Sequence, residues 1–507
     1  MLRRSLSLFT ALLLCLASAA TAQVPARSPA RIPAATSQEQ RAIRAFNAAA
    51  KTSPLELTAF LARMPKGGDL HMHLSGSIYA ETFIKNGAAD ILCVNPSLSF
   101  FKSKATTMSL PPQPVCGEGN QPASDAFKDQ HLYDSLVDSF SMRSFVPSAG
   151  ISGHDQFFAT FARFGAIDKS HVPEWLDEVA TRAAAQNEQY LEIMETPIFA
   201  DVAKLSASIP WPGTPVDPAM NRTGDATGTT REDLSKLRDA LLAGGLRDEV
   251  AIDRKQLDDA LDARNQIENC GQPSATAACS VKIRFLYQVL RGFPPQQVFA
   301  QTVLAFEVAS QDPRVVGLNF VMPEDGYMAM SEYHRQMLML DYLHSVYPKV
   351  HISLHAGELA PGLVPPNGLR FHIREAIDLG HAERIGHGVD VMYENEPQAL
   401  LKEMADRHIM TEINLTHEYA RAALDFNLGY LDVKKMARTS LEHSFLPGAS
   451  LWQEPDNFTR INSACASQPV GSENPAPRCL EFLRSSEKAA EQWQLEHRYQ
   501  IFETSLP

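Results

Sequence analysis

The stretch Val350-His351-Ile352-Ser353-Leu354-His355-Ala356-Gly357-Glu358 places a histidine and a glutamate directly after a short apolar run. A run of this length bounded by a glycine turn is typical of a buried β-strand. Gly357 permits a tight turn, so the side chains of His355 and Glu358 can point the same way from the strand end. The stretch therefore predicts a strand with candidate catalytic or metal-binding residues at its carboxyl end.

Similar strands recur along the chain and alternate with longer helical segments. The expected strands are Asp69–Leu74, Tyr190–Glu195, Lys282–Val289, Val315–Phe320, Val350–Leu354, Arg384–Ile385 and Met410–Leu415. Apolar residues spaced as in Pro294–Ser310 and Ser331–Ser345 predict helices between most of them. This alternation indicates an α/β fold with a parallel sheet. Functional residues at several strand ends favour a (β/α)8 TIM-like barrel over an open doubly wound sheet.

A pair of histidines lies on the first expected strand, in Gly67-Gly68-Asp69-Leu70-His71-Met72-His73. Residues two apart share one face of a strand, so His71 and His73 can bind one metal ion. An isolated pair is ambiguous, but three strand-end histidine sites in one chain make coincidence a poor explanation. Histidines with a nearby carboxylate predict a hydrolytic zinc site.

The bulk composition fits a soluble, exported protein. The chain has 507 residues, a formal net charge of -13 and 44% hydrophobic residues. This acidity argues against nucleic acid or an anionic membrane as a partner and favours a neutral ligand of nucleoside size. Residues 1–22 predict a secretory signal peptide, with Arg3-Arg4, the apolar run Leu6–Leu16 and the cleavage motif Ala20-Thr21-Ala22. No later apolar run is long enough to span a membrane, so we expect a periplasmic or secreted protein.

Six cysteines remain once Cys15 leaves with the signal peptide, and several pairings are open. None of the six forms a C-x-x-C pair, which argues against a cysteine zinc site or a dithiol redox site. Disulfides fit an oxidising compartment. Proximity along the sequence favours the pairs Cys93–Cys116, Cys270–Cys279 and Cys465–Cys479.

Composition also suggests the domain organisation. After the signal peptide we expect a lead-in and helix (23–63), a metal-dependent barrel (64–452) and a C-terminal extension (453–507). Stretches 86–150 and 205–235, rich in Pro, Ser or Gly, are expected to be insertions in the barrel, and 205–235 to be a long surface loop. The cysteine pairs would staple such loop-like segments.

Three motifs, in this order, resemble the adenosine deaminase family. They are His71-Met72-His73-Leu74-Ser75-Gly76-Ser77, His355-Ala356-Gly357-Glu358 and Arg384-Ile385-Gly386-His387-Gly388. The resemblance runs from about Met64 to Trp452, and export with disulfides is similar to the secreted, growth-factor-like branch. The nucleobase deaminases that use H-x-E with P-C-x-x-C are a poor match, because that signature is absent from the sequence.

The resemblance implies one zinc ion per chain, held by His71, His73 and His355. Glu358 would protonate N1 of the purine as water attacks C6, and His387 would orient or deprotonate that water. The implied reaction converts adenosine, or a related purine nucleoside, to inosine and ammonia. The oligomeric state stays open, a homodimer included.

The sequence departs from the family pattern at the substrate site and at the eighth strand. Ser75, before Gly76, stands where the family often has an Asp for the ribose, and the turn through Gly326 is longer than the family's turn beside the purine. We still assign Ser75, Gly76 and Gly326 to substrate binding. The family's strand eight ends in Ser/Thr-x-Asp-Asp-Pro, whose first Asp binds zinc, but no Asp-Asp-Pro occurs here.

The expected seventh strand is followed at once by a segment that resembles the helix after strand eight. One βα unit of about 30–40 residues is therefore expected to be missing. Asp390, Glu412 and His417 are candidates to replace the lost carboxylate.

Three interpretations result. The first is a zinc nucleoside deaminase, and the second is a catalytically impaired exported member that binds nucleoside or a partner. The third, another metal-dependent hydrolase of the wider barrel superfamily, is weakened because no bridging lysine follows a strand.

Overall fold

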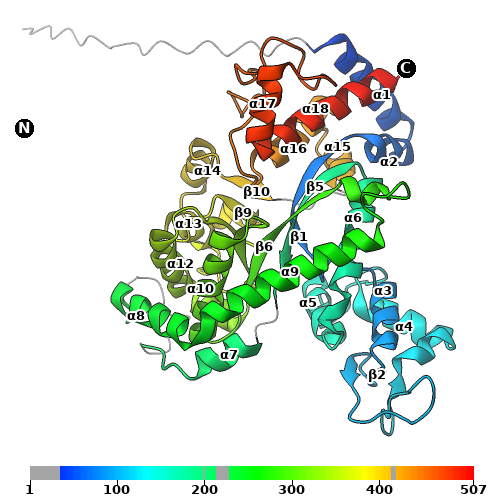
Figure 1. Cartoon of the computed structure of the whole chain (residues 1–507), viewed down its shortest axis with the longest axis vertical. Helices are drawn as coiled ribbons and strands as arrows, with labels where there is room; N and C mark the ends of the chain where they lie inside the picture. Colours follow the sequence, from blue (N-terminus) through cyan, green and yellow to red (C-terminus); the bar gives the residue numbers. More distant parts are fainter. Residues whose placement is uncertain (1–34, 198–199, 213–227, 413–417) are drawn as a thin grey trace, which may run out of the picture.

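The computed structural model describes residues 35–197, 200–212, 228–412 and 418–507. Its centre is a parallel sheet that curves into a nearly closed barrel with helices outside it (Figure 1). The strands, in pairing order, are β1 (Gly67–His73), β5 (Glu188–Glu195), β6 (Lys282–Leu290), β7 (Val315–Val321), β8 (His351–Ala356), β9 (Arg384–His387) and β10 (Met410–Glu412). Every neighbouring pair is parallel. The predicted barrel-like α/β fold with one βα unit missing is confirmed.

The two ends of this sheet are β1 and β10, which are not paired with each other in the described part of the chain. The predicted strand Met410–Leu415 is described only as far as Glu412. Helix α15 (Glu418–Asp425) begins six residues later, which leaves no room for a further strand and helix. The open edges of β1 and β10 therefore mark the position of the absent unit.

The helices around the barrel follow the strands, as the alternating sequence pattern predicts. They are α6 (Val172–Ala185), α7 (Ala200–Ala207), α8 (Arg231–Leu241), α9 (Arg247–Ile267), α10 (Pro295–Gln311), α11 (Tyr327–Ser331), α12 (Tyr333–Val346), α13 (His372–Asp378), α14 (Pro397–Asp406) and α16 (Tyr430–Glu442). Helix α10 shows why apolar residues dominate here: it contacts β6, β7, α9 and α12, so most of its surface is buried. The main core lies between this helical layer and the strands.

The stretch 86–150 forms a lobe that projects from the barrel (Figure 1). After α3 (Ala80–Ala89) it contains a small antiparallel sheet, β2 (Leu92–Val94), β3 (Phe100–Lys102) and β4 (Gln121–Pro122), followed by α4 (Gln130–Phe140). Helix α5 (Gly153–Phe164) then returns the chain to the barrel. This lobe is more regular than its Pro- and Ser-rich composition suggests.

The disulfides join the three pairs that proximity favours, Cys93–Cys116, Cys270–Cys279 and Cys465–Cys479. The expectation of one long loop over 205–235 is wrong at both ends, because α7 runs into it and α8 begins within it. Residues 213–227, and the predicted signal peptide 1–22, lie outside the described residues.

The C-terminal segment packs against the start of the described chain. Helix α18 (Glu487–Ser505) lies beside α1 (Ser37–Thr52) and contacts α2 (Pro54–Arg63), and α17 (Pro477–Ser485) packs on α18 (Figure 1). The rings of Phe60 and Phe502 meet edge to face at 5.3 Å, and the Tyr499 hydroxyl donates to the carbonyl oxygen of Pro65 at 2.9 Å. Helix α1 begins inside the expected lead-in, because Thr36 and Glu39 form a capping box. The extension is thus part of a second core rather than a loose tail.

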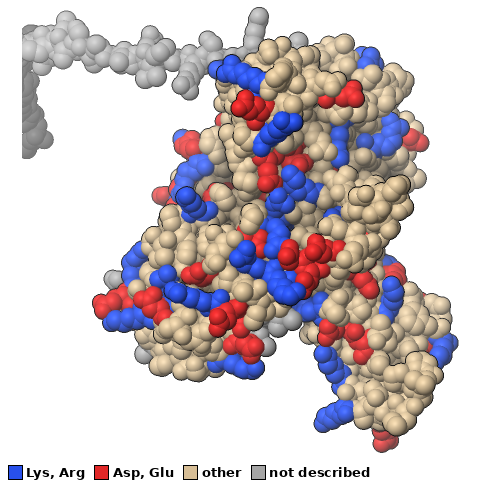
Figure 2. Space-filling model, in the orientation of Figure 1, with Lys and Arg blue, Asp and Glu red and all other residues tan. Residues whose placement is uncertain are grey.

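Acidic and basic side chains are interspersed on the face that Figure 2 shows, with Lys and Arg gathered near its centre beside a cluster of Asp and Glu. Among the described helices, none is long and apolar enough to cross a membrane.

Candidate metal centre

Four histidines from three strands meet at the carboxyl end of the barrel. His71 and His73 come from β1, His355 from β8 and His387 from the end of β9. Ligand nitrogens of His71, His355 and His387 lie within 4.8 Å of one another. The Nε2 atoms of His73 and His355 are 3.1 Å apart. The structure therefore brings together all three predicted metal ligands, together with His387.

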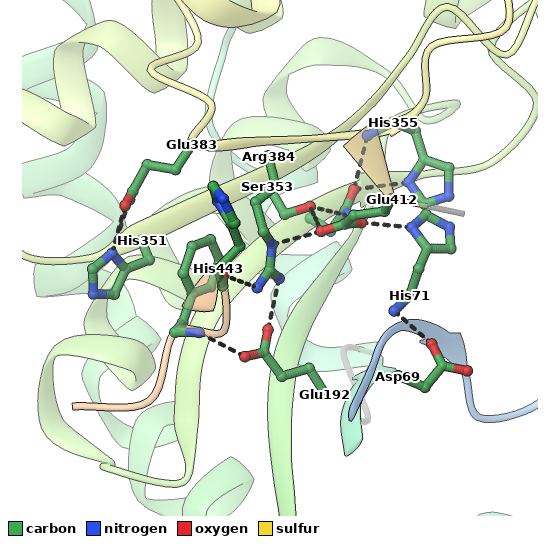
Figure 3. A network of polar contacts seen from close by, with 12 residues as sticks. Asp69, His71, Glu192, His351, Ser353, His355, Glu383, Arg384, Glu412 and His443 are labelled. Carbon is green, nitrogen blue, oxygen red and sulfur yellow. Dashed lines mark hydrogen bonds and ion pairs between the residues drawn. The ribbon is translucent and has the colours of Figure 1, made fainter. Parts of the chain in front are cut away.

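Each of the three predicted ligands uses its Nδ1 atom to contact a side-chain oxygen. Nδ1 of His71 is 2.7 Å from Oε2 of Glu412, and Nδ1 of His73 is 2.8 Å from Oε1 of Gln288. Nδ1 of His355 is 2.8 Å from Oδ1 of Asn319 (Figure 3 shows His71, Glu412 and His355). An oxygen partner fixes the proton on Nδ1 and orients the ring, the arrangement that metal-bound histidines adopt.

The partner atoms can be identified as oxygens from their other bonds. Oδ1 of Asn319 also accepts the backbone N–H of His355 at 3.1 Å, and Nε2 of Gln288 donates to the Thr196 hydroxyl at 2.8 Å. With protons on Nδ1, the facing Nε2 atoms of His73 and His355 both present lone pairs. Two lone pairs at 3.1 Å repel each other unless a cation lies against both.

The Nε2 atom of His71 supports the same interpretation. It is buried and has no hydrogen-bond partner among the residues that the structure describes. An unpartnered buried nitrogen costs free energy, and a metal ion would satisfy it. The donor set of imidazole nitrogens is one that Zn²⁺ prefers. The residues present thus fit a zinc ion.

The electrostatic surroundings keep the rings of His73, His355 and His387 neutral. Burial, reinforced by the neighbouring histidines, lowers the pKa of His73 to about 3 and that of His387 to about 4. The same causes hold the pKa of His355 well below its usual range. Neutral imidazoles are the form that binds a metal.

Glu412 contacts Nδ1 of His71, so it orients this histidine from behind and does not face its free Nε2 atom. Its Oε2 contacts His71, and its Oε1 accepts the Ser353 hydroxyl at 2.9 Å and forms an ion pair with Nε of Arg384 at 2.6 Å (Figure 3). Burial alone would raise the pKa of Glu412, but Arg384 and His71 outweigh it and lower the pKa to about 2. The carboxylate is therefore ionised and accepts the His71 proton.

Of the two other candidates for the lost carboxylate, only Asp390 lies within the described residues. Asp390 is buried beside Gly357, where a Cβ atom would lie 2.3 Å from its Oδ1. His417 lies outside the described residues. Among the described side chains, no carboxylate is grouped with the His71, His355 and His387 ligand atoms.

A loop after β8 presents the predicted proton donor. Oε1 of Glu358 is 3.6 Å from Nε2 of His387, and burial, reinforced by Glu324, raises the pKa of Glu358. Glu324, fully buried, accepts the backbone N–H groups of Gly357 at 3.0 Å and Glu358 at 2.7 Å and contacts Nδ1 of His372. Glu324 thus fixes the loop, and the raised pKa lets Glu358 keep its proton at higher pH than an ordinary glutamate does.

Glycine at position 386 makes the close packing of these elements possible. A Cβ atom there would lie 2.8 Å from Cε1 of His71, so any larger residue on β9 would displace that ring. The next residue, His387, has a left-handed backbone with φ +73°. Such a conformation is uncommon outside glycine and turns the His387 ring toward His71, whose centroid is 4.6 Å away.

The predicted substrate residues lie around the same end of the barrel. Ser75 and the exposed Gly76 form the turn after β1, and a Cβ atom on Gly76 would lie 3.3 Å from that of His73. Gly326 precedes α11, next to Asp325, which contacts Nε2 of His154 at 3.0 Å. Ser75 and Gly76 are therefore adjacent to the centre, and Gly326 belongs to the loop that carries Glu324.

Sequence reasoning missed the groups that orient the histidines. Asn319 is a polar residue inside the otherwise apolar strand β7, and that interruption was the available signal. Strand β6 also carries Lys282 and Arg284, so Gln288 does not stand out in it. Glu324 gave no signal of its own because it lies in a polar turn.

Comparisons with known proteins agree with this geometry. Residues 261–444 match the family model described as adenosine deaminase, which confirms the predicted resemblance over that stretch. His355, Glu358 and His387 fall inside the match, whereas His71 and His73 precede it. No curated protein matches the sequence.

Several solved structures are similar in fold at low identity. Arabidopsis ADAL complexed with GMP is 15% identical, with 77% of this chain and 94% of that one covered and a TM-score of 0.41. An adenine deaminase from Arthrobacter aurescens is 14% identical (76% and 94% covered, TM-score 0.41). An amidohydrolase from Burkholderia ambifaria with bound Zn is 12% identical (89% and 94% covered, TM-score 0.44).

Proposed function

We propose that this protein is a zinc-dependent hydrolase that deaminates adenosine, or a related purine nucleoside, to inosine and ammonia outside the cytoplasm. The observation that carries the proposal is the set of three oriented imidazoles. His71, His73 and His355 each contact a side-chain oxygen through Nδ1, which leaves Nε2 available for a metal ion, and the Nε2 atoms of His73 and His355 are 3.1 Å apart. The match of residues 261–444 to the adenosine deaminase family supports the choice of reaction.

One zinc ion per chain would be held by His71, His73 and His355. When bound, zinc lowers the pKa of a water molecule to roughly 7 and so makes a nucleophile available at neutral pH. His387, whose ring is neutral and 5.2 Å from that of His355 between centroids, would orient this water and accept its proton.

Glu358 would supply the proton that the purine needs. Its raised pKa favours the protonated carboxyl group, the form that can donate to N1 as the ring loses aromaticity at C6. The 3.6 Å separation between Oε1 of Glu358 and Nε2 of His387 supports their proposed roles as proton donor and proton acceptor at one site. Ser75, Gly76 and Gly326 would line the substrate side.

Export of the protein rests on the predicted signal peptide and on the disulfides. All six cysteines of the mature chain are paired in the structure, which is compatible with an oxidising compartment. The net charge of -13 supports a neutral small molecule over nucleic acid as the partner.

A second candidate is a catalytically impaired protein that still binds a nucleoside or a partner. The observation that favours it is the open sheet edge at β10, where the family pattern would continue to a carboxylate ligand. Glu412 does not replace that ligand, because both of its oxygens are engaged by His71, Ser353 and Arg384.

The two candidates are separated by measuring the loss of adenosine absorbance with purified, zinc-loaded mature protein. Turnover that disappears in His355→Ala, with inosine as the product, supports the deaminase. Zinc binding without turnover in a folded, monodisperse sample supports the impaired binder. A product other than inosine, or turnover unchanged in His355→Ala, would overturn the deaminase assignment.

A further inference from the structure

A second cavity lies at the opposite end of the strands that carry the histidines. It measures about 600 Å³, within the range of small-molecule sites. His351 and Arg384, which line this cavity, are the first residues of β8 and β9. The same two strands end at the metal centre, with His355 and His387. The cavity is therefore separate from the proposed catalytic site, although the two share their strands.

The lining of the cavity holds more cations than carboxylates, although Arg384 and Arg407 are paired with carboxylates that lie outside the lining. Its lining holds four lysines and arginines against two glutamates, a formal excess of 4 - 2 = 2 positive charges, whereas the whole chain carries -13. Five of the chain's 16 histidines line it as well. Such a concentration of one sign in a concave site attracts anions. The charged lining residues are Lys349, Arg384, Arg407, Lys488, Glu383 and Glu442, and the histidines are His344, His351, His381, His408 and His443.

Lys488, at the start of α18, is the cation with spare hydrogen-bonding capacity. Its ammonium group donates to the carbonyl oxygen of Glu442 at 2.8 Å. Throughout the described residues, no carboxylate oxygen lies within 4.0 Å of it, and burial lowers its pKa, with Arg384 acting in the same direction. An ammonium group has three donors, so capping the C-terminal end of α16 leaves two unused.

His443 faces the same cations, and Asp456 compensates for them only in part. Burial and then Arg384, Lys488 and His408 lower its pKa to about 4, and only Asp456 acts in the opposite direction. A bound anion would relieve this repulsion and supply the missing acceptor. Lys488 and His443 are thus the pair of side chains that an anion would satisfy.

The size and walls of the cavity indicate that the anionic group belongs to a larger organic molecule. A free phosphate ion would fill only a small part of about 600 Å³. One wall is the outer face of the His351 ring, which stacks on Phe445 at 4.7 Å with an interplanar angle of 10°, while Arg384 lies over the opposite face of Phe445. An organic body could pack against this wall while its charged group reaches Lys488.

We propose that this cavity binds a small organic phosphate monoester, with the phosphate held by Lys488 and His443. Phosphate oxygens accept several charge-assisted hydrogen bonds, which matches the free donors here.

Arg384 connects the proposed site to the metal centre. Its NH1 donates to the carbonyl oxygen of His443 at 2.9 Å, and its Nε forms an ion pair with Glu412, which contacts His71 (Figure 3). A ligand that shifts His443 would therefore act on the group that orients a metal ligand.

The test is calorimetric titration of the metal-free, full mature protein with ribose 5-phosphate and with inorganic phosphate. Metal-free protein removes competition from the histidine centre, so the result does not depend on deaminase activity. We expect saturable binding of ribose 5-phosphate, tighter than that of inorganic phosphate. Lys488→Met should weaken it roughly tenfold or more, because a charged hydrogen bond is lost.

The matched control is Lys255→Met, which removes an exposed lysine on α9 that pairs with Asp259. It should leave the affinity unchanged. His443→Gln serves as a second variant if Lys488→Met does not fold, and circular dichroism checks both. No binding by the unsubstituted protein, or equal binding by the Lys488 and Lys255 variants, would overturn the site. Binding of the ester no tighter than inorganic phosphate would overturn the organic ligand.

Discussion

Histidines gather at both ends of β8 and β9, but the two groups differ in what holds their rings. At the carboxyl ends, His71, His73 and His355 bond through Nδ1 to buried or half-buried side-chain oxygens on other strands. At the amino ends, His351 and His381 pair with half-exposed carboxylates of Glu383 and Asp341. The contacts at the carboxyl ends fix the direction of each free Nε2 atom. The pairs at the amino ends mainly balance the charge of exposed carboxylates. Orientation, more than the number of histidines, distinguishes the metal centre from the cavity.

The largest expected effect comes from removing a ring at the carboxyl end. His355→Ala should lower zinc content well below one per chain and reduce any adenosine turnover by more than about 100-fold, because a ligand is lost outright. Elemental analysis and the absorbance assay measure the two effects. His131→Ala, an exposed histidine on α4, is the control and should retain both. Full zinc occupancy in His355→Ala would contradict the proposed ligand set.

The orienting role of Glu412 is the next test. Glu412→Gln keeps the size of the side chain but removes the charge that holds His71 and Arg384, so zinc affinity should fall about 10- to 100-fold. Competition with a fluorescent zinc chelator measures this. Glu383→Gln, which alters the pairing of His351 at the other end, should leave zinc affinity unchanged. An equal loss of zinc affinity in Glu412→Gln and Glu383→Gln would contradict the specific role of Glu412 in orienting His71.

A glycine pair tests the loop that carries Glu358. In Gly357→Ala, the new Cβ would lie 2.3 Å from Oδ1 of Asp390 at a residue with φ +72°, so Glu358 should be displaced and turnover should fall about tenfold or more. Gly362 also has positive φ but open space around it, so Gly362→Ala should cost only about 1 kcal/mol of stability. Steady-state kinetics and urea unfolding separate the two. Equal kinetics would show that the position of Glu358 is unimportant.

The smallest effect concerns the amino-end cavity. His443 has a pKa of about 4 in the folded protein against an ordinary 6.5, so the unfolded chain takes up the proton first as pH falls. Its contribution to stability is therefore complete above pH 6.5 and is lost progressively toward pH 4. In His443→Gln, the free energy of unfolding should therefore fall by up to about 2 kcal/mol less between pH 7 and pH 5 than it does in the unsubstituted protein. Urea unfolding at pH 7 and pH 5 measures it, and an unchanged pH dependence would contradict the assignment.

The sequence predicts the barrel well because its strands are buried on both faces and read as short apolar runs between helical segments. It also locates His71, His73, His355 and His387, since each falls at or near a strand end. What it does not predict is pairing across the chain. Glu412 lies 341 residues from His71, and nothing near either residue indicates that they touch.

The same limit explains the missed cavity. Lys488 and His443 come from the start of one helix and the end of another, and each is an ordinary polar residue in its own segment. Only the packing of α18 against α16 brings them to the same space. Composition also misled over 205–235, where Pro and Gly near the centre of the stretch obscured helices at both ends.

The packing of α18 against α1 and α2 has a consequence for how the polypeptide is made. Phe60 and the carbonyl of Pro65, immediately before β1, find their partners in Phe502 and Tyr499, more than 430 residues later. During synthesis the amino-terminal helices therefore emerge from the ribosome long before the surface that covers them. Their apolar faces therefore stay exposed to solvent, or bound by a chaperone, until translation is nearly complete.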